Sequence, residues 1–164
     1  AVEQRDWSQL ERHPYYLLAH RAIATQLVVE IRRKITEKTQ LTASGGIGPN
    51  PLLAKICSDF NKPDGQYYVP PTRVAVMMEM ERLKIRKVPG IGKVTERILK
   101  EALAVENCAD IFEKRYLIFG LFSPISSSFL LRSSLGVPSS GFHQRDGADA
   151  QRGKEPAGKG VKRK

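Results

Sequence analysis

The longest stretch of helical periodicity lies near the N-terminus, over residues 15–38. Apolar residues recur there at intervals of three and four, which is the spacing of one face of an α-helix. Charged residues, among them Arg33 and Lys34, fall on the other side. The pattern predicts a long amphipathic helix with a basic exposed face. The residues of its apolar stripe are Ala24, Leu27, Val28, Ile31 and Ile35.

Two short strands are predicted after this helix. Residues 41–47 contain Gly45 and Gly46, which allow another backbone or a ligand to come close to a strand. Residues 66–69 follow a segment dense in turn-forming residues and read as a second strand. A helix is expected between the strands, over 51–60, because an asparagine suited to capping precedes a proline suited to the first helical position.

Only helices are predicted beyond the proline pair at 70 and 71, over 73–82, 93–103 and 109–119.

The C-terminal segment, residues 137–164, is rich in Gly, Ser, Ala, Arg and Lys, a composition that cannot bury enough apolar area to offset the cost of ordering it. We therefore expect an α+β chain. Its parts are a mixed helix and strand region over 1–70, an all-helical region over 71–136, and a disordered basic tail over 137–164.

Composition narrows the class of partner. The 164 residues include 27 Lys and Arg against 17 Asp and Glu, a net charge of +10, which favours nucleic acid ahead of a membrane surface. No apolar run approaches the roughly 20 residues that span a bilayer. Cys57 and Cys108 are too few and too far apart for a disulfide scaffold or a zinc site, so they are expected to be buried thiols in a reducing compartment. The chain begins without Met, which suggests a fragment or a processed chain.

The sharpest local signal is the hairpin segment, residues 87–95, with the sequence KVPGIGKVT. Its two glycines permit a tight turn that a Cβ would obstruct, and the isoleucine between them is expected to fill the gap between the flanking helices. A helix begins directly afterwards, and its unpaired N–H groups and positive dipole end suit a phosphate. The pattern matches a helix-hairpin-helix, which holds duplex DNA by its backbone without reading bases. The candidate DNA-binding residues are Lys87, Gly90, Ile91, Gly92 and Lys93. The alternative is an ordinary turn between helices.

A second candidate is Lys55, which lies in the middle of a predicted helix among apolar neighbours and after the glycine-rich strand. A lysine in that setting can bind a triphosphate as a point charge. The alternative is a solvated lysine with no ligand. The segment is not a P-loop, because its glycines are not followed by Gly-Lys-Ser/Thr at a helix start.

These segments together resemble one family. Residues 41–67 (LTASGGIGPNPLLAKICSDFNKPDGQY) resemble the late palm, and residues 85–103 (IRKVPGIGKVTERILKEAL) the thumb helix-hairpin-helix, of the Y-family, DinB-like translesion DNA polymerases. The resemblance covers about residues 12–147. It implies a monomeric nuclear enzyme that copies past damaged bases using Mg2+, with Lys55 on the triphosphate of the incoming nucleotide and the hairpin segment on primer-template DNA.

The sequence also departs from that family. The magnesium-binding acids and the fingers lie upstream of this segment in the family, and the little-finger domain follows it, so no catalytic or metal-binding residue is assigned to this chain. We therefore expect the chain alone not to polymerise DNA, and expect a splice product or an imperfect gene model that ends early. Two alternatives stay open: a non-catalytic DNA-binding module, and a helical interaction domain whose basic faces only solubilise it.

Overall fold

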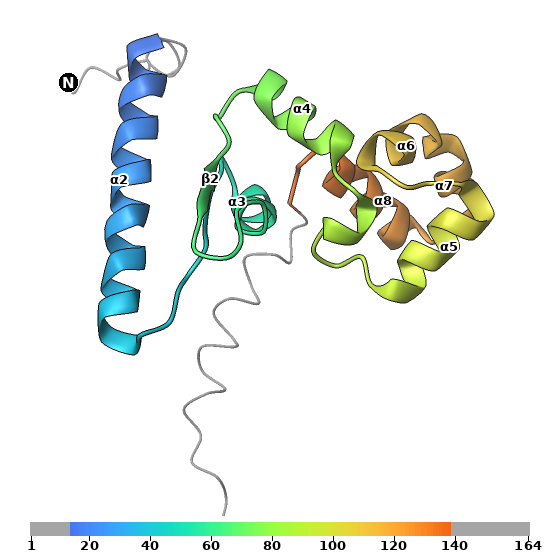
Figure 1. Cartoon of the computed structure of the whole chain (residues 1–164). Coiled ribbons are helices and arrows are strands. Elements are labelled where there is room, and N and C mark those ends of the chain that lie inside the picture. The colour runs from blue at the N-terminus through green and yellow to red at the C-terminus, as the bar shows by residue number, and fades with distance from the viewer. Residues whose placement is uncertain (1–13, 139–164) are drawn as a thin grey trace, which may run out of the picture.

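The computed structural model describes residues 14–138 and shows a mixed α+β arrangement, rich in helices (Figure 1). The first group of elements is α2 (Pro14–Thr39), β1 (Gly45–Ile47), α3 (Pro51–Cys57) and β2 (Gln66–Tyr68). The second group is α4 (Arg73–Arg82), the 3-10 turn η1 (Ile85–Lys87), α5 (Lys93–Leu103), α6 (Cys108–Glu113), α7 (Arg115–Leu121) and α8 (Pro124–Ser134). Helix α4 leads from the sheet into the cluster formed by α5 to α8 (Figure 1).

The two strands are parallel, and α3 is the connection between them. Two consecutive glycines of β1 set the distance to the helices on either face. A Cβ on Gly45 would lie 2.5 Å from Val28 Cγ1 of α2, and one on Gly46 would lie 1.9 Å from the Ala54 carbonyl oxygen of α3. Because successive strand residues point to opposite faces, α2 and α3 cover opposite faces of the sheet. The glycines therefore admit a neighbouring backbone, as predicted, and α3 fills the space that a ligand would need.

Only part of the apolar stripe predicted for α2 packs against a neighbouring element. Ala24 and Val28 are half-buried against the sheet, whereas Leu27, Ile31 and Ile35 are 55%, 48% and 38% exposed. The sheet formed by the described residues has only two strands, and these cover a narrow arc of the helix. Periodicity identified the helix correctly, but it could not tell which part of the stripe a neighbour covers.

A polar side chain occupies part of that packed face instead. Arg32 donates from Nε to the Ala43 carbonyl oxygen at 2.7 Å, and its Nη2 pairs with Asp64 Oδ1 at 2.6 Å. Its side chain is only 16% exposed. One arginine thus ties α2 to the chain that enters β1 and to the turn before β2. The predicted basic exposed face is present in Arg33 and Lys34, which are exposed and paired along the helix.

A single buried cluster runs from α3 through α4 into the helical group. Each fully buried aliphatic side chain contributes about 1.5–3 kcal/mol, so the buried residues of α3 hold it against the helical group. The cluster crosses the proline pair at 70 and 71, and the division into parts at 70 and 136 stays a prediction. Its members from α3 to α5 are Leu52, Leu53, Ile56, Met80, Leu83, Ile85, Val88, Ile91, Leu99 and Leu103.

Several element bounds differ from those predicted. The helix expected over 51–60 ends at Cys57, and the strands expected over 41–47 and 66–69 are shorter. The helix expected over 109–119 is two helices, α6 and α7, that meet at Lys114. Helix α8 has no predicted counterpart, because serine is a weak helix former. In α8 the buried Ser127 is satisfied by donating from Oγ to the Ile118 carbonyl oxygen at 3.0 Å.

Both cysteines are free and buried, as predicted. Burial raises the pKa of Cys57 to about 11 and that of Cys108 to about 12, so both remain uncharged thiols at neutral pH. Among residues 14–138, no helix is both long and apolar enough to cross a membrane. The tail predicted over 137–164 lies almost wholly outside the described residues.

Asn50 joins α3 to the end of the helical group. Its Oδ1 accepts from the Leu53 N–H at 2.9 Å as the N-cap of α3, and its Nδ2 donates to the Gly136 carbonyl oxygen at 2.9 Å. Asn50→Ser keeps a capping oxygen but cannot reach Gly136, and should lower the free energy of unfolding by about 1 kcal/mol. Asn50→Ala also loses the cap and should cost about 1 kcal/mol more. Urea denaturation of both variants tests this, and equal losses would show that the cap contributes nothing.

Candidate nucleic-acid and nucleotide interface

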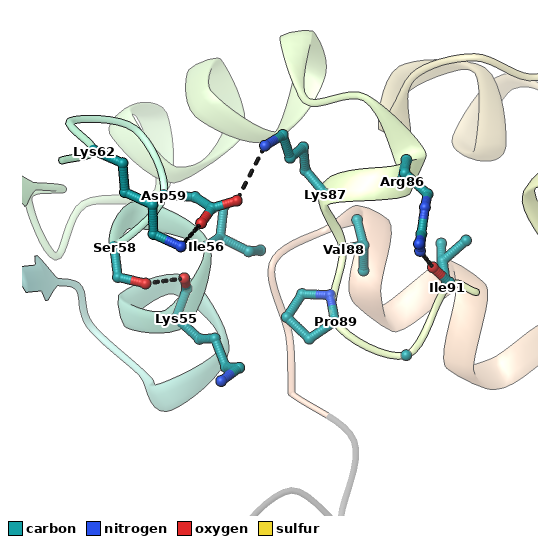
Figure 2. A pocket seen from close by; sticks show the side chains of 11 residues that line it. Lys55, Ile56, Ser58, Asp59, Lys62, Arg86, Lys87, Val88, Pro89 and Ile91 are labelled. Atoms are coloured by element: carbon teal, nitrogen blue, oxygen red, sulfur yellow. Dashed lines mark hydrogen bonds and ion pairs between the residues drawn. The ribbon is translucent and has the colours of Figure 1, made fainter. Parts of the chain in front are cut away.

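A cationic pocket of about 300 Å³ lies between α3 and the hairpin segment (Figure 2). Lys55, Ser58, Asp59 and Lys62 line it from α3 and the turn that follows, and the other wall runs from Arg86 to Ile91. The two segments that the sequence marks as candidates thus meet at one place, although they are more than 30 residues apart in the chain.

Lys55 lies on the solvent side of α3. It is exposed, while its neighbours Leu53 and Ile56 are buried in the core cluster. Its ammonium makes no hydrogen bond or ion pair with the residues the structure describes, and in Figure 2 it points away from Asp59 toward the space beside Pro89. The packing of α3 therefore presents an unpaired cation to the pocket, and the role of Lys55 as a nucleotide ligand stays a prediction.

Gly90 and Ile91 form the turn of the hairpin segment. Gly90 has a φ of +98°, a conformation that side chains other than glycine rarely adopt, and a Cβ there would lie 2.6 Å from Phe129 Cζ. Ile91 is 2% exposed and packs in the core cluster. Arg86 donates from Nη1 to the Ile91 carbonyl oxygen at 2.7 Å. The turn is thus held by packing on α8 and by one arginine.

The surroundings of Gly92 differ from those predicted. It is the N-cap of α5 with an ordinary φ of −82°, and a Cβ at this position would meet nothing within 4 Å. A side chain here would not obstruct the turn, so that part of the prediction is wrong. Gly92 also has no side chain to satisfy the first N–H groups of α5. Lys93, the first residue of α5, is exposed beside it and does not line the pocket.

The chain before the turn is not a full helix. Residues Ile85–Lys87 form one 3-10 turn, because the backbone just before them is engaged elsewhere. Lys84 forms an antiparallel bridge with Asn107, and the Ile85 N–H donates to the Glu106 carbonyl oxygen at 3.0 Å. Only α5 is a complete helix at the hairpin segment, and the helix-hairpin-helix assignment stays a prediction.

Carboxylates partly neutralise the cations of the pocket. Lys87 Nζ lies 3.0 Å from Asp59 Oδ2, and Lys62 pairs with the other carboxylate oxygen. These two lysines, Lys62 first, hold the pKa of Asp59 below its usual range. Arg86 Nε lies 3.4 Å from Glu96 Oε2. The sequence analysis assigned no role in the site to Asp59, Lys62 or Arg86. The contact of Asp59 with Lys87 joins residues 28 positions apart, which leaves no local signal in the sequence.

No metal centre is formed by the described residues. Across residues 14–138, no three His, Cys, Asp or Glu side chains gather closely enough to hold a metal ion. Asp59, which lines the pocket, and Glu96, which pairs with the pocket residue Arg86, are each engaged with cations. The expected Mg2+ therefore has no ligand set among these side chains, and no catalytic step is assigned to them.

Sequence comparisons place this chain among known proteins. Residues 3–59 match the model of the impB/mucB/samB family. The chain is 52% identical over 124 residues to human DNA polymerase kappa, a match that covers 76% of this chain and 14% of the relative. It is 49% identical over 88 residues to DNA polymerase IV of Photorhabdus laumondii, covering 54% of this chain and 24% of the relative. The chain thus spans only a small part of the curated relatives it matches.

Solved structures agree with the sequence comparisons. DinB from Sulfolobus solfataricus aligns with a TM-score of 0.59 and 31% identity, over 68% of this chain and 32% of that one. An insertion ternary complex of Dbh DNA polymerase aligns with a TM-score of 0.63 and 28% identity, over 76% of this chain and 36% of that one. The fold is thus similar to about a third of these polymerases.

The two glycines of the hairpin segment should respond differently to substitution. Gly90→Ala forces a side chain into a strained conformation against Phe129, and should lower the free energy of unfolding by about 1–3 kcal/mol. Gly92→Thr introduces a larger side chain that can still cap α5, and should change it by less than about 0.5 kcal/mol. Thermal or urea denaturation checks the contrast. Similar losses at the two positions would contradict the open surroundings of Gly92.

Proposed function

We propose that this chain, which belongs to the Y-family of DNA polymerases, supplies the part of a translesion polymerase that holds primer-template DNA and the incoming nucleotide. In this function Lys55 contacts the triphosphate of a deoxynucleotide, and the hairpin segment contacts backbone phosphates. The whole enzyme is a DNA-directed DNA polymerase, a nucleotidyltransferase of DNA repair. The observation that carries the proposal is that Lys55 and the hairpin segment line the same cationic pocket.

The hairpin segment has three properties that suit a phosphate. The first N–H groups of α5 have no partner within the helix, and its dipole places partial positive charge there. The open space at Gly92 lets a sugar-phosphate backbone approach those N–H groups. Lys93 adds a full charge beside them, and Lys87 adds another across the turn. Contacts of this kind, made to phosphates, position DNA without specifying its sequence.

Lys55 suits a triphosphate because its ammonium has no ion pair within the described residues that must be broken before the triphosphate binds. Its ammonium has no carboxylate partner in the described part of the chain, and α3 is fixed by its buried residues. A lysine so placed acts as a compact point charge on a flexible stem, which matches a mobile phosphate group. Ser58 caps the end of α3 next to it by donating to the Lys55 carbonyl oxygen at 2.7 Å.

Chemistry at the primer end needs a divalent metal ion, as is general in this family, and we propose Mg2+ for the whole enzyme. Such ions neutralise charge that develops on the transferred phosphoryl group. Residues 14–138 hold and orient substrates instead. A primer-extension assay with this chain alone should therefore show no incorporation above a Lys55→Ala control.

We further propose that the protein is a monomer that acts in the nucleus, on the basis of its similarity to the human and mouse kappa polymerases.

The second candidate function is a non-catalytic DNA-binding module that uses the hairpin segment alone. It is favoured by the cations gathered at the pocket and by the lack of a metal-ligand set among the described residues. The two functions differ at Lys55. A polymerase segment binds a deoxynucleoside triphosphate there, whereas a binding module has no use for that contact.

Salt dependence of DNA binding tests the proposed phosphate contacts. The chain should bind duplex DNA with an affinity that falls steeply between about 50 and 200 mM salt, and equally for unrelated sequences. Lys93→Gln should make the slope of log K against log salt shallower by about 1. Gly92→Thr should weaken binding about tenfold while leaving stability unchanged, because its side chain blocks the approach of the backbone.

Lys38→Gln is the matched control, since it removes an equal charge from the exposed end of α2. It should leave the slope nearly unchanged. Equal effects of Lys93→Gln and Lys38→Gln would mean that DNA is held by net charge alone, as in a helical domain with merely solubilising basic faces. Strong dependence of affinity on DNA sequence would argue for a different way of docking.

A further inference from the structure

Asp59 is the one carboxylate among the residues that line the pocket of the described chain. It follows α3 and lies opposite the hairpin segment, and each of its oxygens accepts from a different lysine (Figure 2). Lys62 belongs to the same turn, three residues further on. Lys87 comes from the opposite wall, so its contact of 3.0 Å joins the two sides of the pocket.

This pairing occupies a lysine that the hairpin segment would use on DNA. Lys55 has no partner within the described residues, whereas Lys87 is neutralised by Asp59 in the free protein. The pair is accessible, with the Lys87 side chain 55% and the Asp59 side chain 35% exposed. An accessible ion pair is screened by solvent and is weak, so that a stronger anion can replace its carboxylate.

Asp59 keeps an ion-pair partner when its contact with Lys87 is broken. Its other oxygen keeps Lys62, which is close in sequence and needs no movement of the hairpin segment. An exchange at Lys87 therefore leaves no carboxylate without a partner. A DNA backbone phosphate offers Lys87 the same kind of acceptor oxygens, together with the counterion release that accompanies binding to a polyanion.

We propose that Asp59 is an internal substitute for a DNA phosphate, which holds Lys87 in the free protein and yields it when the hairpin segment binds duplex DNA. This inference rests on the proposed function of the hairpin segment. Asp59 then lowers the affinity of the chain for DNA, because each binding event must first break its contact with Lys87. DNA binding also releases the hairpin segment from the turn that follows α3, next to Lys55.

The test is a double-mutant cycle of Asp59→Asn and Lys87→Gln, measured in the full chain with duplex DNA over a range of salt. Lys87→Gln should make the slope of log K against log salt shallower by about 0.9, since one phosphate contact is lost. Asp59→Asn should raise affinity about two- to fivefold with an unchanged slope, because the contact forms in both proteins. In the Lys87→Gln background, Asp59→Asn should lose most of this gain.

Asp64→Asn is the matched control. It removes an equal charge from the same turn region, where Asp64 pairs with Arg32 rather than with a pocket lysine, and it should raise affinity less. Asp59→Ser should reproduce Asp59→Asn, and thermal unfolding should show that all variants fold.

Three results would overturn the inference. An equal gain from Asp59→Asn with and without Lys87 would mean that Asp59 acts only through long-range charge. No effect of Lys87→Gln on the slope, with a steeper slope for Asp59→Asn, would mean that Asp59 keeps Lys87 when DNA is bound. Wild-type chain that fails to bind DNA at low salt would instead overturn the proposed function, and the inference with it.

Discussion

Helix α3 lies so close to β1 that only a glycine fits at position 46, where a Cβ would meet the helix backbone. This contact fixes the side that α3 turns to the sheet. The side that faces the helical group is then filled by Leu52, Leu53 and Ile56, and the remaining side, with Lys55, faces solvent. The position of the candidate site thus depends on the close packing of the β1 backbone on the α3 backbone at Gly46, rather than on a contact made by a polar side chain.

The hairpin segment is placed by the same core. Val88 and Ile91 are buried in the cluster that contains Ile56, and Gly90 lies against Phe129 of α8. The ends of the segment therefore remain outside the core, with Lys87 on the side of the pocket and Lys93 on the side of α5. A rigid apolar base with exposed cations at its rim suits a ligand whose charge is spread along a chain, such as the backbone of DNA.

Local signals predicted much of this arrangement. The helices over 73–82 and 93–103 have the predicted bounds, because a capping threonine and a glycine turn mark their starts. The exposure of part of the apolar stripe of α2 and the one-turn η1 could not be predicted in this way, since each depends on which distant segment lies alongside. The pairing of Asp59 with Lys87 is of the same kind: both residues look like ordinary surface charges until α3 and the hairpin segment come together.

We propose that α5 begins at a phosphate-binding turn that is open at Gly92 and flanked by lysines. The decisive experiment follows the backbone amide resonances of the full chain while duplex DNA is added at low ionic strength. The amide resonances of residues 92–95 should shift strongly and to the same extent with two unrelated duplexes, while those of α7 stay in place. Unmoved resonances at 92–95, in a chain that nevertheless binds the DNA, would contradict the proposal.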